Sequence, residues 1–199
     1  PSNLPNCFVA AYSSDGFYSN ALSIGGYPNL GFNEMGRATV TDNLGNVYVT
    51  GYFYGNTDFD PSASIANLTS TGGADIFIAK YDADGNYLWA KGVGGMENDD
   101  GFSIALDASG QIYVTGFFQG TADFYPSVAT ANITTVGLGD IFIAKYDTNG
   151  NYIWSKAMGG TNTDLSYEIT VDSSGQVYIS GFFQDTVDFD TSAATSNHI

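Results

Sequence analysis

The stretch GFSIALDASGQIYVTG, Gly101–Gly116, decides the fold because the chain contains it three times. It appears earlier as GRATVTDNLGNVYVTG, Gly36–Gly51, and later within LSYEITVDSSGQVYISG, Leu165–Gly181, at equal spacing. A second phrase, DIFIAKYDADGNYLWAKGVGG at Asp75–Gly95, returns with the same spacing as DIFIAKYDTNGNYIWSKAMGG at Asp140–Gly160. A fixed period of this kind is typical of repeat architectures, so the chain is expected to be built from copies of one unit.

Each full repeat predicts four antiparallel strands, because apolar and polar residues alternate and Val, Ile, Tyr and Phe are frequent. In one repeat the expected strands are FSIALD (Phe102–Asp107), QIYVTGFF (Gln111–Phe118), IFIAKYD (Ile141–Asp147) and NYIWSKAM (Asn151–Met158). A four-stranded meander repeated with short links is typical of a propeller blade. We therefore expect an all-β fold, a β-propeller with blades of about 65 residues.

Short turns that begin with Asp and end with Gly join the expected strands, as at Asp107–Gly110 and Asp147–Gly150. The Asp side chain caps its own turn, and Gly supplies the positive φ. The Asp-Ala-Asp-Gly at Asp82–Gly85 superficially resembles a calcium loop, but it lacks the downstream ligands and the terminal Glu of such a loop. The sequence therefore predicts a turn there.

The two phrases Gly101–Gly116 and Asp75–Gly95 resemble the bacterial β-propeller repeat called SBBP, and more distantly the NHL repeat. The resemblance covers the chain from Asn6 to about Asp190. It implies a propeller fold, and it implies membership of large secreted or cell-surface proteins.

The repeat boundaries predict a single propeller unit over residues 1–199 with three blade equivalents. Residues 33–95 are expected to form blade one, residues 98–160 blade two, and residues 163–199 the first half of blade three. Residues 6–26 align without a gap to residues 75–95, so they are expected to supply strands three and four of the last blade.

Three blades are too few to close a ring at the spacing of about 10 Å that packed sheets need. If the termini were joined, Asn197 would precede Asn6 by the same interval by which Asn132 precedes Asp140. We therefore expect the two ends to share a blade. Three arrangements satisfy this register: a six-bladed ring of two chains, a segment of a longer propeller, or an open head-to-tail assembly.

The composition excludes several classes of function. With 21 acidic and 5 basic residues and a formal charge of −16, the chain has too few cations for nucleic acid or anionic membranes. No apolar run is long enough to span a membrane. The single cysteine, Cys7, permits no intrachain disulfide and is expected to be a small buried residue, and the single histidine, His198, offers no credible catalytic triad. We expect a non-enzymatic protein.

Two long loops, Tyr54–Ala74 and Gln119–Gly139, follow the second strand of their repeats and show little strand pattern. Loops of this length in a compact domain are usually functional. Carboxylates recur in these loops and in the links to the next blade, and clustered carboxylates can bind Ca²⁺. The alternative is that they cap turns and strand ends. The candidate metal ligands are Asp58, Asp60 and Asp123 in the loops, Asp188 and Asp190 at the equivalent place of the third repeat, and Glu34, Asp99 and Asp164 in the links.

Aromatic residues near the same loops, Tyr54, Tyr125, Phe118 and Phe183, are candidates for ligand binding. The first functional hypothesis is a secreted or cell-surface adhesion-type module that binds a protein or glycan at the long-loop face. No cofactor other than Ca²⁺ is suggested, and self-association or neighbouring blades of the same protein are expected partners. The alternatives are a carbohydrate-binding propeller and, with least support, a polysaccharide-cleaving enzyme, since its acids would not recur in every blade.

Overall fold

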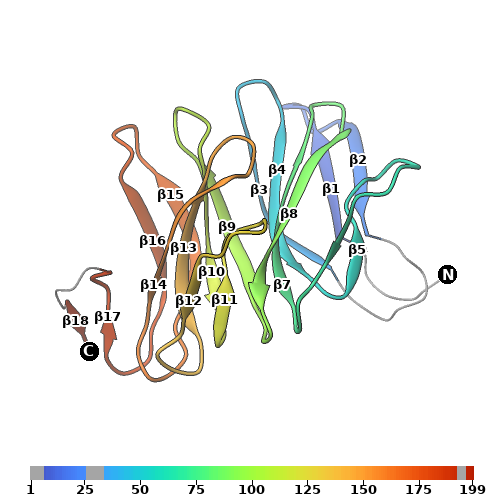
Figure 1. Cartoon of the computed structure of the whole chain (residues 1–199). Helices are drawn as coiled ribbons and strands as arrows, with labels where there is room; N and C mark the ends of the chain where they lie inside the picture. Colours follow the sequence, from blue (N-terminus) through green and yellow to red (C-terminus); the bar gives the residue numbers. More distant parts are fainter. Residues whose placement is uncertain (1–6, 26–33, 192–195) are drawn as a thin grey trace.

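The computed structural model describes residues 7–25, 34–191 and 196–199, and every regular element within them is a β-strand (Figure 1). Two four-stranded antiparallel meanders form the centre. The first contains β3 (Met35–Thr41), β4 (Val47–Phe53), β7 (Asp75–Tyr81) and β8 (Tyr87–Gly95). The second contains β9 (Asp100–Leu106), β10 (Ile112–Phe118), β13 (Asp140–Tyr146) and β14 (Tyr152–Met158). These strands confirm the predicted four-stranded unit.

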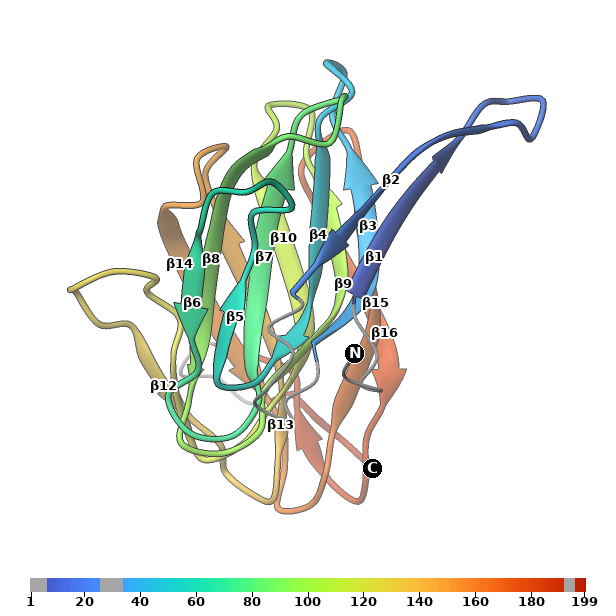
Figure 2. The ribbon, with the colours of Figure 1, turned by 90° about the vertical axis from the view of Figure 1, so that its right-hand side faces the viewer.

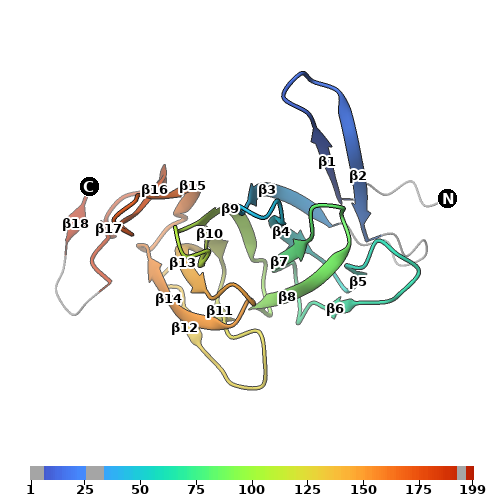
Figure 3. The same cartoon turned by 90° about the horizontal axis from the view of Figure 1, so that it is seen from above.

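Two further hairpins lie at opposite ends of the molecule (Figure 3). One is β1 (Cys7–Tyr12) with β2 (Tyr18–Ile24), and the other is β15 (Leu165–Val171) with β16 (Val177–Phe182). In the repeat, β1 and β2 correspond to the third and fourth strands of a meander, and β15 and β16 to the first and second. Each hairpin is therefore half of a meander.

The first strands of successive units, β3, β9 and β15, pack beside one another, and the sheets spread outward from them (Figure 3). This arrangement of twisted antiparallel sheets around neighbouring inner strands is that of a β-propeller-like fold. The fold class expected from the sequence is confirmed. The domain limits and the number of blades in a ring stay predictions.

The core fills the spaces between sheets. Ile76 and Ile78 of β7 pack in one cluster with Ile104, Val114 and Phe142 of the next meander. Both faces of a middle strand are covered in such a stack, because each sheet lies between two others. Middle strands are therefore almost continuously apolar and buried.

The outer strands carry the tryptophans. Trp89 packs edge-on against Tyr48 with ring centroids 6.2 Å apart, and Trp154 makes the same contact with Tyr113 at 6.2 Å. Cys7 is buried, as predicted, and burial raises the pKa of its thiol to about 11. These residues act in packing.

The Asp-x-x-Gly turns have the predicted geometry. Asp82 Oδ1 accepts hydrogen bonds from the backbone N–H of Asp84 at 3.0 Å and of Asn86 at 2.8 Å. Gly85 has a φ of 86°, a left-handed conformation that disfavours other residues. The carboxylate thus organises a turn, which confirms the turn interpretation of Asp82–Gly85.

The long loops are more regular than predicted, since each contains a short hairpin, here called an arm. The arms are β5 (Asn56–Asp58) with β6 (Asn67–Thr69), β11 (Thr121–Asp123) with β12 (Asn132–Thr134), and β17 (Val187–Asp188) with β18 (Asn197–His198). Figure 2 shows the first arm lying beside the first meander. Strands this short cannot show a period of two, so no sequence pattern marks them.

Candidate functional site: the long-loop face

Each arm lies on the last strand of the preceding unit. Strand β11 pairs with the end of β8 through Ala122 opposite Gly95 and Asp123 opposite Gly94. This contact between an arm and the last strand of the preceding unit is here called the clasp. It also occurs one unit earlier, where Gly25 N–H donates to Asp58 O at 2.9 Å. A third copy is the bridge between Gly159 and Asp188. The long-loop face is therefore a row of arms, each fixed to two units.

The aspartates of the arms close the arms themselves. Asp58 Oδ1 accepts hydrogen bonds from the backbone N–H of Asp60 at 3.0 Å and of Ala66 at 2.8 Å. Asp123 and Asp188 make the equivalent pairs of bonds. These contacts support the alternative interpretation, in which the loop aspartates cap turns.

The acids of the links join neighbouring units. Asp99 is fully buried, and its two oxygens accept hydrogen bonds from Gly95 N–H at 2.7 Å and Gln119 N–H at 3.1 Å. Asp164 is equally buried and makes the equivalent bonds to Gly160 and Gln184. Burial raises the pKa of Asp99 to about 7.

Glu34 occupies the equivalent link position of the first unit. It is buried as well, and burial raises the pKa of its carboxyl to about 7. Its side chain lies against Gly25, where a Cβ would collide with it. Glycine at this place thus provides the room for the carboxyl group.

Sequence reasoning missed two buried carboxylates, Asp75 and Asp140, which begin β7 and β13. Asp75 Oδ2 accepts a hydrogen bond from Thr71 N–H at 2.9 Å, and Asp140 Oδ2 accepts one from Val136 N–H at 2.9 Å. Within the described residues the Oδ1 atom of each has no hydrogen-bond partner. Burial raises the pKa of Asp75 to about 6 and also raises that of Asp140.

The signal for these two residues was present in the sequence, because Asp opens the repeated phrase DIFIAKY. Asp75 also faces the link acid Asp99. A Cβ placed on Gly94 would lie 2.8 Å from both Asp75 Oδ1 and Asp99 Oδ2. The negative charge of Asp75 adds to the effect of burial in raising the pKa of Asp99, because a nearby like charge disfavours the ionised form.

Equivalent cavities open beside the two carboxylates. One of about 270 Å³ is lined by Asp75, Gly94, Asp123 and Tyr125, and its counterpart of about 270 Å³ by residues of the next unit, among them Asp140 and Gly159. Asp188 and Asp190 line the second cavity. The recurrence shows that the junction between units has a defined polar recess.

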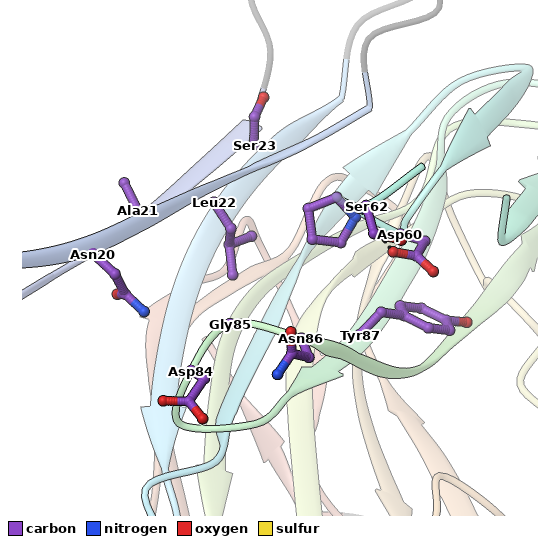
Figure 4. Close-up of a pocket in the computed structure, with 11 residues that line it drawn as sticks. Asn20, Ala21, Leu22, Ser23, Asp60, Ser62, Asp84, Gly85, Asn86 and Tyr87 are labelled. Carbon is purple, nitrogen blue, oxygen red and sulfur yellow. Dashed lines mark hydrogen bonds between the residues drawn. The ribbon is translucent and has the colours of Figure 1, made fainter. Parts of the chain in front are cut away.

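A larger pocket of about 450 Å³ lies between β2 and the turn that joins β7 to β8 (Figure 4). Asn20 and Leu22 line it from the hairpin, and Asp60, Asp84 and Tyr87 from the first meander. Of the predicted metal ligands, only Asp60 borders this pocket. The pocket exists because the β1–β2 hairpin spreads away from the sheet beside it.

The predicted metal ligands are distributed along the face. Within residues 7–25, 34–191 and 196–199, no group of three or more His, Cys, Asp or Glu side chains could hold a metal ion. The loop aspartates, such as Asp58, accept hydrogen bonds from backbone N–H groups of their own arms. Asp99 and Asp164 accept hydrogen bonds from backbone N–H groups at the junctions between units. Calcium binding stays a prediction.

Phe118 was expected to contact a ligand, and that expectation is wrong. Its side chain is fully buried and packs edge-on against Phe124 with centroids 5.8 Å apart. The reason is its place at the end of β10, a middle strand that pairs with β9 and β13.

The other aromatic candidates reach the surface. Tyr54 is half-buried and its hydroxyl donates to Asn98 Oδ1 at 3.4 Å. Tyr125 is half-buried in an arm, with its ring 5.3 Å from that of Tyr152. Phe183 is partly exposed after β16. Whether they bind a ligand stays a prediction.

The arms and links also expose large apolar side chains that sequence reasoning did not single out. Exposed apolar side chains that form a contiguous patch mark binding surfaces. The exposed apolar residues of this face are Ile65, Met96, Val128, Val136 and Leu138. Their signal in the sequence is an apolar residue inside an otherwise polar loop.

Comparison with known proteins agrees with this architecture. The chain is 30% identical over 132 residues to an uncharacterized WD repeat-containing protein of Acanthamoeba polyphaga mimivirus, a match covering 58% of the chain and 10% of that protein. The chain is similar to a WD-repeat protein. It is also 28% identical over 145 residues to the regulatory protein FlaEY of Caulobacter vibrioides, covering 73% of the chain and 15% of FlaEY.

The chain thus spans a small part of the length of these relatives. No family model matches it. Neither relative's name denotes an enzyme. Among the described residues there is no helix with the length and hydropathy needed to cross a bilayer.

Proposed function

We infer that the chain is a β-propeller interaction module that binds a protein partner through the long-loop face. The observation that carries this inference is the set of exposed apolar side chains on the arms, on the segments that follow them and on the links. Leu138 is 66% exposed and Val136 is 73% exposed, although both lie in the segment between β12 and β13, whose backbone is held by hydrogen bonds. The likeness to a WD repeat-containing protein supports the same general role.

The arm loops present these side chains at low entropic cost. Gln119 Nε2 donates to the carbonyl oxygen of Leu138 at 3.2 Å, and Val136 N–H donates to the buried Asp140. A loop that is already ordered loses little conformational freedom on binding, so its apolar contacts contribute more fully to affinity.

The test uses a photo-crosslinking residue at position 138, with position 44 as the matched control. Leu44 is 82% exposed in the turn between β3 and β4, on the opposite face. We expect crosslinks to a partner protein from position 138 only. The partner is then purified, and Leu138→Ser should weaken its binding at least tenfold while Leu44→Ser does not. Equal crosslinking from both positions, or equal affinity of both variants, refutes the inference.

A carbohydrate ligand is the second candidate, favoured by the recess that Tyr125 and Asp123 line. An aromatic ring beside carboxylates is a common arrangement for binding sugars. A glycan array decides between the candidates. Binding that is lost in Tyr125→Ala and kept in Leu138→Ser supports the sugar site over the protein site.

The proposal extends to a secreted or cell-surface setting with an adhesion role, supported by the SBBP-like phrases and the charge of −16. Protease treatment of intact cells that make the protein tests this, since a surface protein is cleaved.

Calcium is proposed to order the arms through Asp58, Asp123 and Asp188. A bound ligand raises the unfolding midpoint, so EDTA should lower it; an unchanged midpoint refutes the calcium proposal.

A further inference from the structure

The structure contains two half-meanders with complementary open edges. Within the described residues, β16 pairs with β15 and leaves its other edge open, while β1 pairs with β2 and leaves its other edge open. In the complete meanders the equivalent strands pair with each other, as β4 with β7 and β10 with β13. The open edge of β16 therefore lacks a third strand of the β1 type, and the open edge of β1 lacks a second strand of the β16 type. An unpaired edge of this kind is a template for another strand.

The side chains of the two edges have the character of core residues. Phe8 of β1 is 73% exposed, whereas its equivalent Phe77 in β7 is 0% exposed. Tyr12 is 64% exposed, and its equivalent Tyr81 is 0% exposed. On the other edge, Tyr178 is exposed where Tyr48 and Tyr113 are buried. Both half-meanders thus expose rings that a complete blade would cover.

A triplet of phenylalanines shows what is missing. In the first unit Phe59 packs 5.5 Å from Phe53 and 5.0 Å from Phe77. The second unit repeats this triplet with Phe118, Phe124 and Phe142. In the third unit two rings are present, Phe183 and Phe189, with centroids 5.7 Å apart. The third ring would come from a β7-type strand, at the position that Phe8 holds in β1.

A hydroxyl group points to the same pairing. Thr50 Oγ1 donates to Phe77 O at 2.9 Å, and Thr115 Oγ1 donates to Phe142 O at 2.7 Å. The equivalent residue in β16 is Ser180, which keeps the hydroxyl donor. The residue of β1 equivalent to Phe77 and Phe142 is Phe8, so the carbonyl oxygen of Phe8 would be the acceptor for Ser180. The ring of Phe8, the hydroxyl group of Ser180 and the open strand edges therefore all indicate the same pairing register between β16 and β1.

We propose that the β1–β2 hairpin of a second copy of this chain pairs with the open edge of β16 and completes that blade. The register is the one seen in complete meanders, where Val47 faces Tyr81 and Ile112 faces Tyr146. Transferred to the open edges, it pairs Val177 with Tyr12. One copy cannot make this contact with itself, since the two hairpins lie at opposite ends of the molecule (Figure 3).

Disulfide trapping tests the register. In a Cys7→Ala background, Ile179→Cys and Ala10→Cys occupy directly paired positions, equivalent to Val49 opposite Ala79. A shift of one residue turns a side chain to the other face of a strand, so Ile179→Cys with Ala11→Cys is the matched control. We expect covalent oligomers from the first pair in the intact chain at low protein concentration, and none from the control. Equal yields from both pairs, or none from either, overturn the proposal.

A second experiment uses association without cysteines. Phe8 and Phe17 are equally exposed, at 73% and 74%, and both belong to the β1–β2 hairpin, but only Phe8 lies on the strand that would pair. Light scattering should show the wild-type chain and Phe17→Ser at twice the monomer mass or more, and Phe8→Ser shifted at least tenfold in concentration toward monomer. A wild-type monomer at 100 μM overturns the proposal. The protein partner proposed for the long-loop face is tested with Leu138→Ser, which leaves the open edges of β1 and β16 intact. Failure of one proposal can therefore be distinguished from failure of the other.

Discussion

Replacing Asp75 with asparagine should stabilise the protein, and more so as the pH rises. Asp75 is 3% exposed, its Oδ1 has no hydrogen-bond partner among the described residues, and burial raises the pKa of its carboxyl group from 3.8 to about 6. The folded state therefore holds this proton more tightly than the unfolded state. Its contribution to stability is complete below pH 3.8 and is lost as the pH rises through about 6.

The magnitude follows from the same pKa values. One pKa unit corresponds to about 1.4 kcal/mol, so the raised pKa of Asp75 lowers the free energy of unfolding by roughly 3 kcal/mol at pH 8 and by about 1 kcal/mol at pH 4.5, relative to its value well below pH 3.8. Asparagine avoids this cost. Its oxygen can keep the hydrogen bond from Thr71 N–H. We expect a gain in the free energy of unfolding of up to about 3 kcal/mol at pH 8.

Urea unfolding of wild type and Asp75→Asn in EDTA, at pH 4.5 and pH 8, measures the effect. Asp82→Asn is the matched control, because hydrogen bonds from Asn86 lower the pKa of that exposed carboxyl. The loss of stability in Asp82→Asn relative to wild type should be nearly the same at pH 4.5 and pH 8, because a carboxylate with a lowered pKa contributes its stabilisation above pH 3.8 and loses it only as the pH falls through the folded-state pKa. Destabilisation by Asp75→Asn at pH 8 in EDTA would show that the ionised carboxylate makes a favourable contact, and the reasoning from burial would be refuted.

Three further predictions follow from the core and the charge. Phe124→Ala should lower the free energy of unfolding by about 3–5 kcal/mol and expose its arm to limited proteolysis, because this ring is fully buried between Phe118 and Phe142; an unchanged urea midpoint contradicts this. Thr115→Val should cost about 1 kcal/mol in the same assay, since it removes the hydrogen bond to Phe142 O. Because each copy carries a charge of −16, raising the salt concentration should strengthen self-association in light scattering, and weaker association at high salt would count against pairing of apolar edges.

The sequence predicted the strands and tight turns because their signals are local. Alternation of apolar residues marks β9, β10, β13 and β14, and an aspartate such as Asp82 organises its turn with atoms only a few residues away. The propeller-like stacking also followed, since a fixed repeat period requires equivalent neighbours. These features need no information about distant contacts.

What the sequence did not predict depends on contacts between units. Phe118 was a candidate for ligand binding because it adjoins a long loop, but it ends a middle strand whose two faces are both covered. Asp75 and Asp140 looked like ordinary strand ends, and their burial arises from the neighbouring link and from a glycine that makes room for them. The clasp of β11 on β8 joins segments whose pairing has no pattern in either one.

The clasp between each arm and the preceding unit affects how the row of repeat units unfolds. Each arm is encoded in one unit but completes the sheet edge of the unit before it, so no unit reaches its full set of backbone hydrogen bonds by itself. Repeat proteins whose stability resides in the interfaces between units unfold cooperatively, because losing one unit removes the support of the next. Growth of such a chain by duplication preserves the clasp when whole repeat units are added, and a truncation inside an arm also weakens the preceding blade.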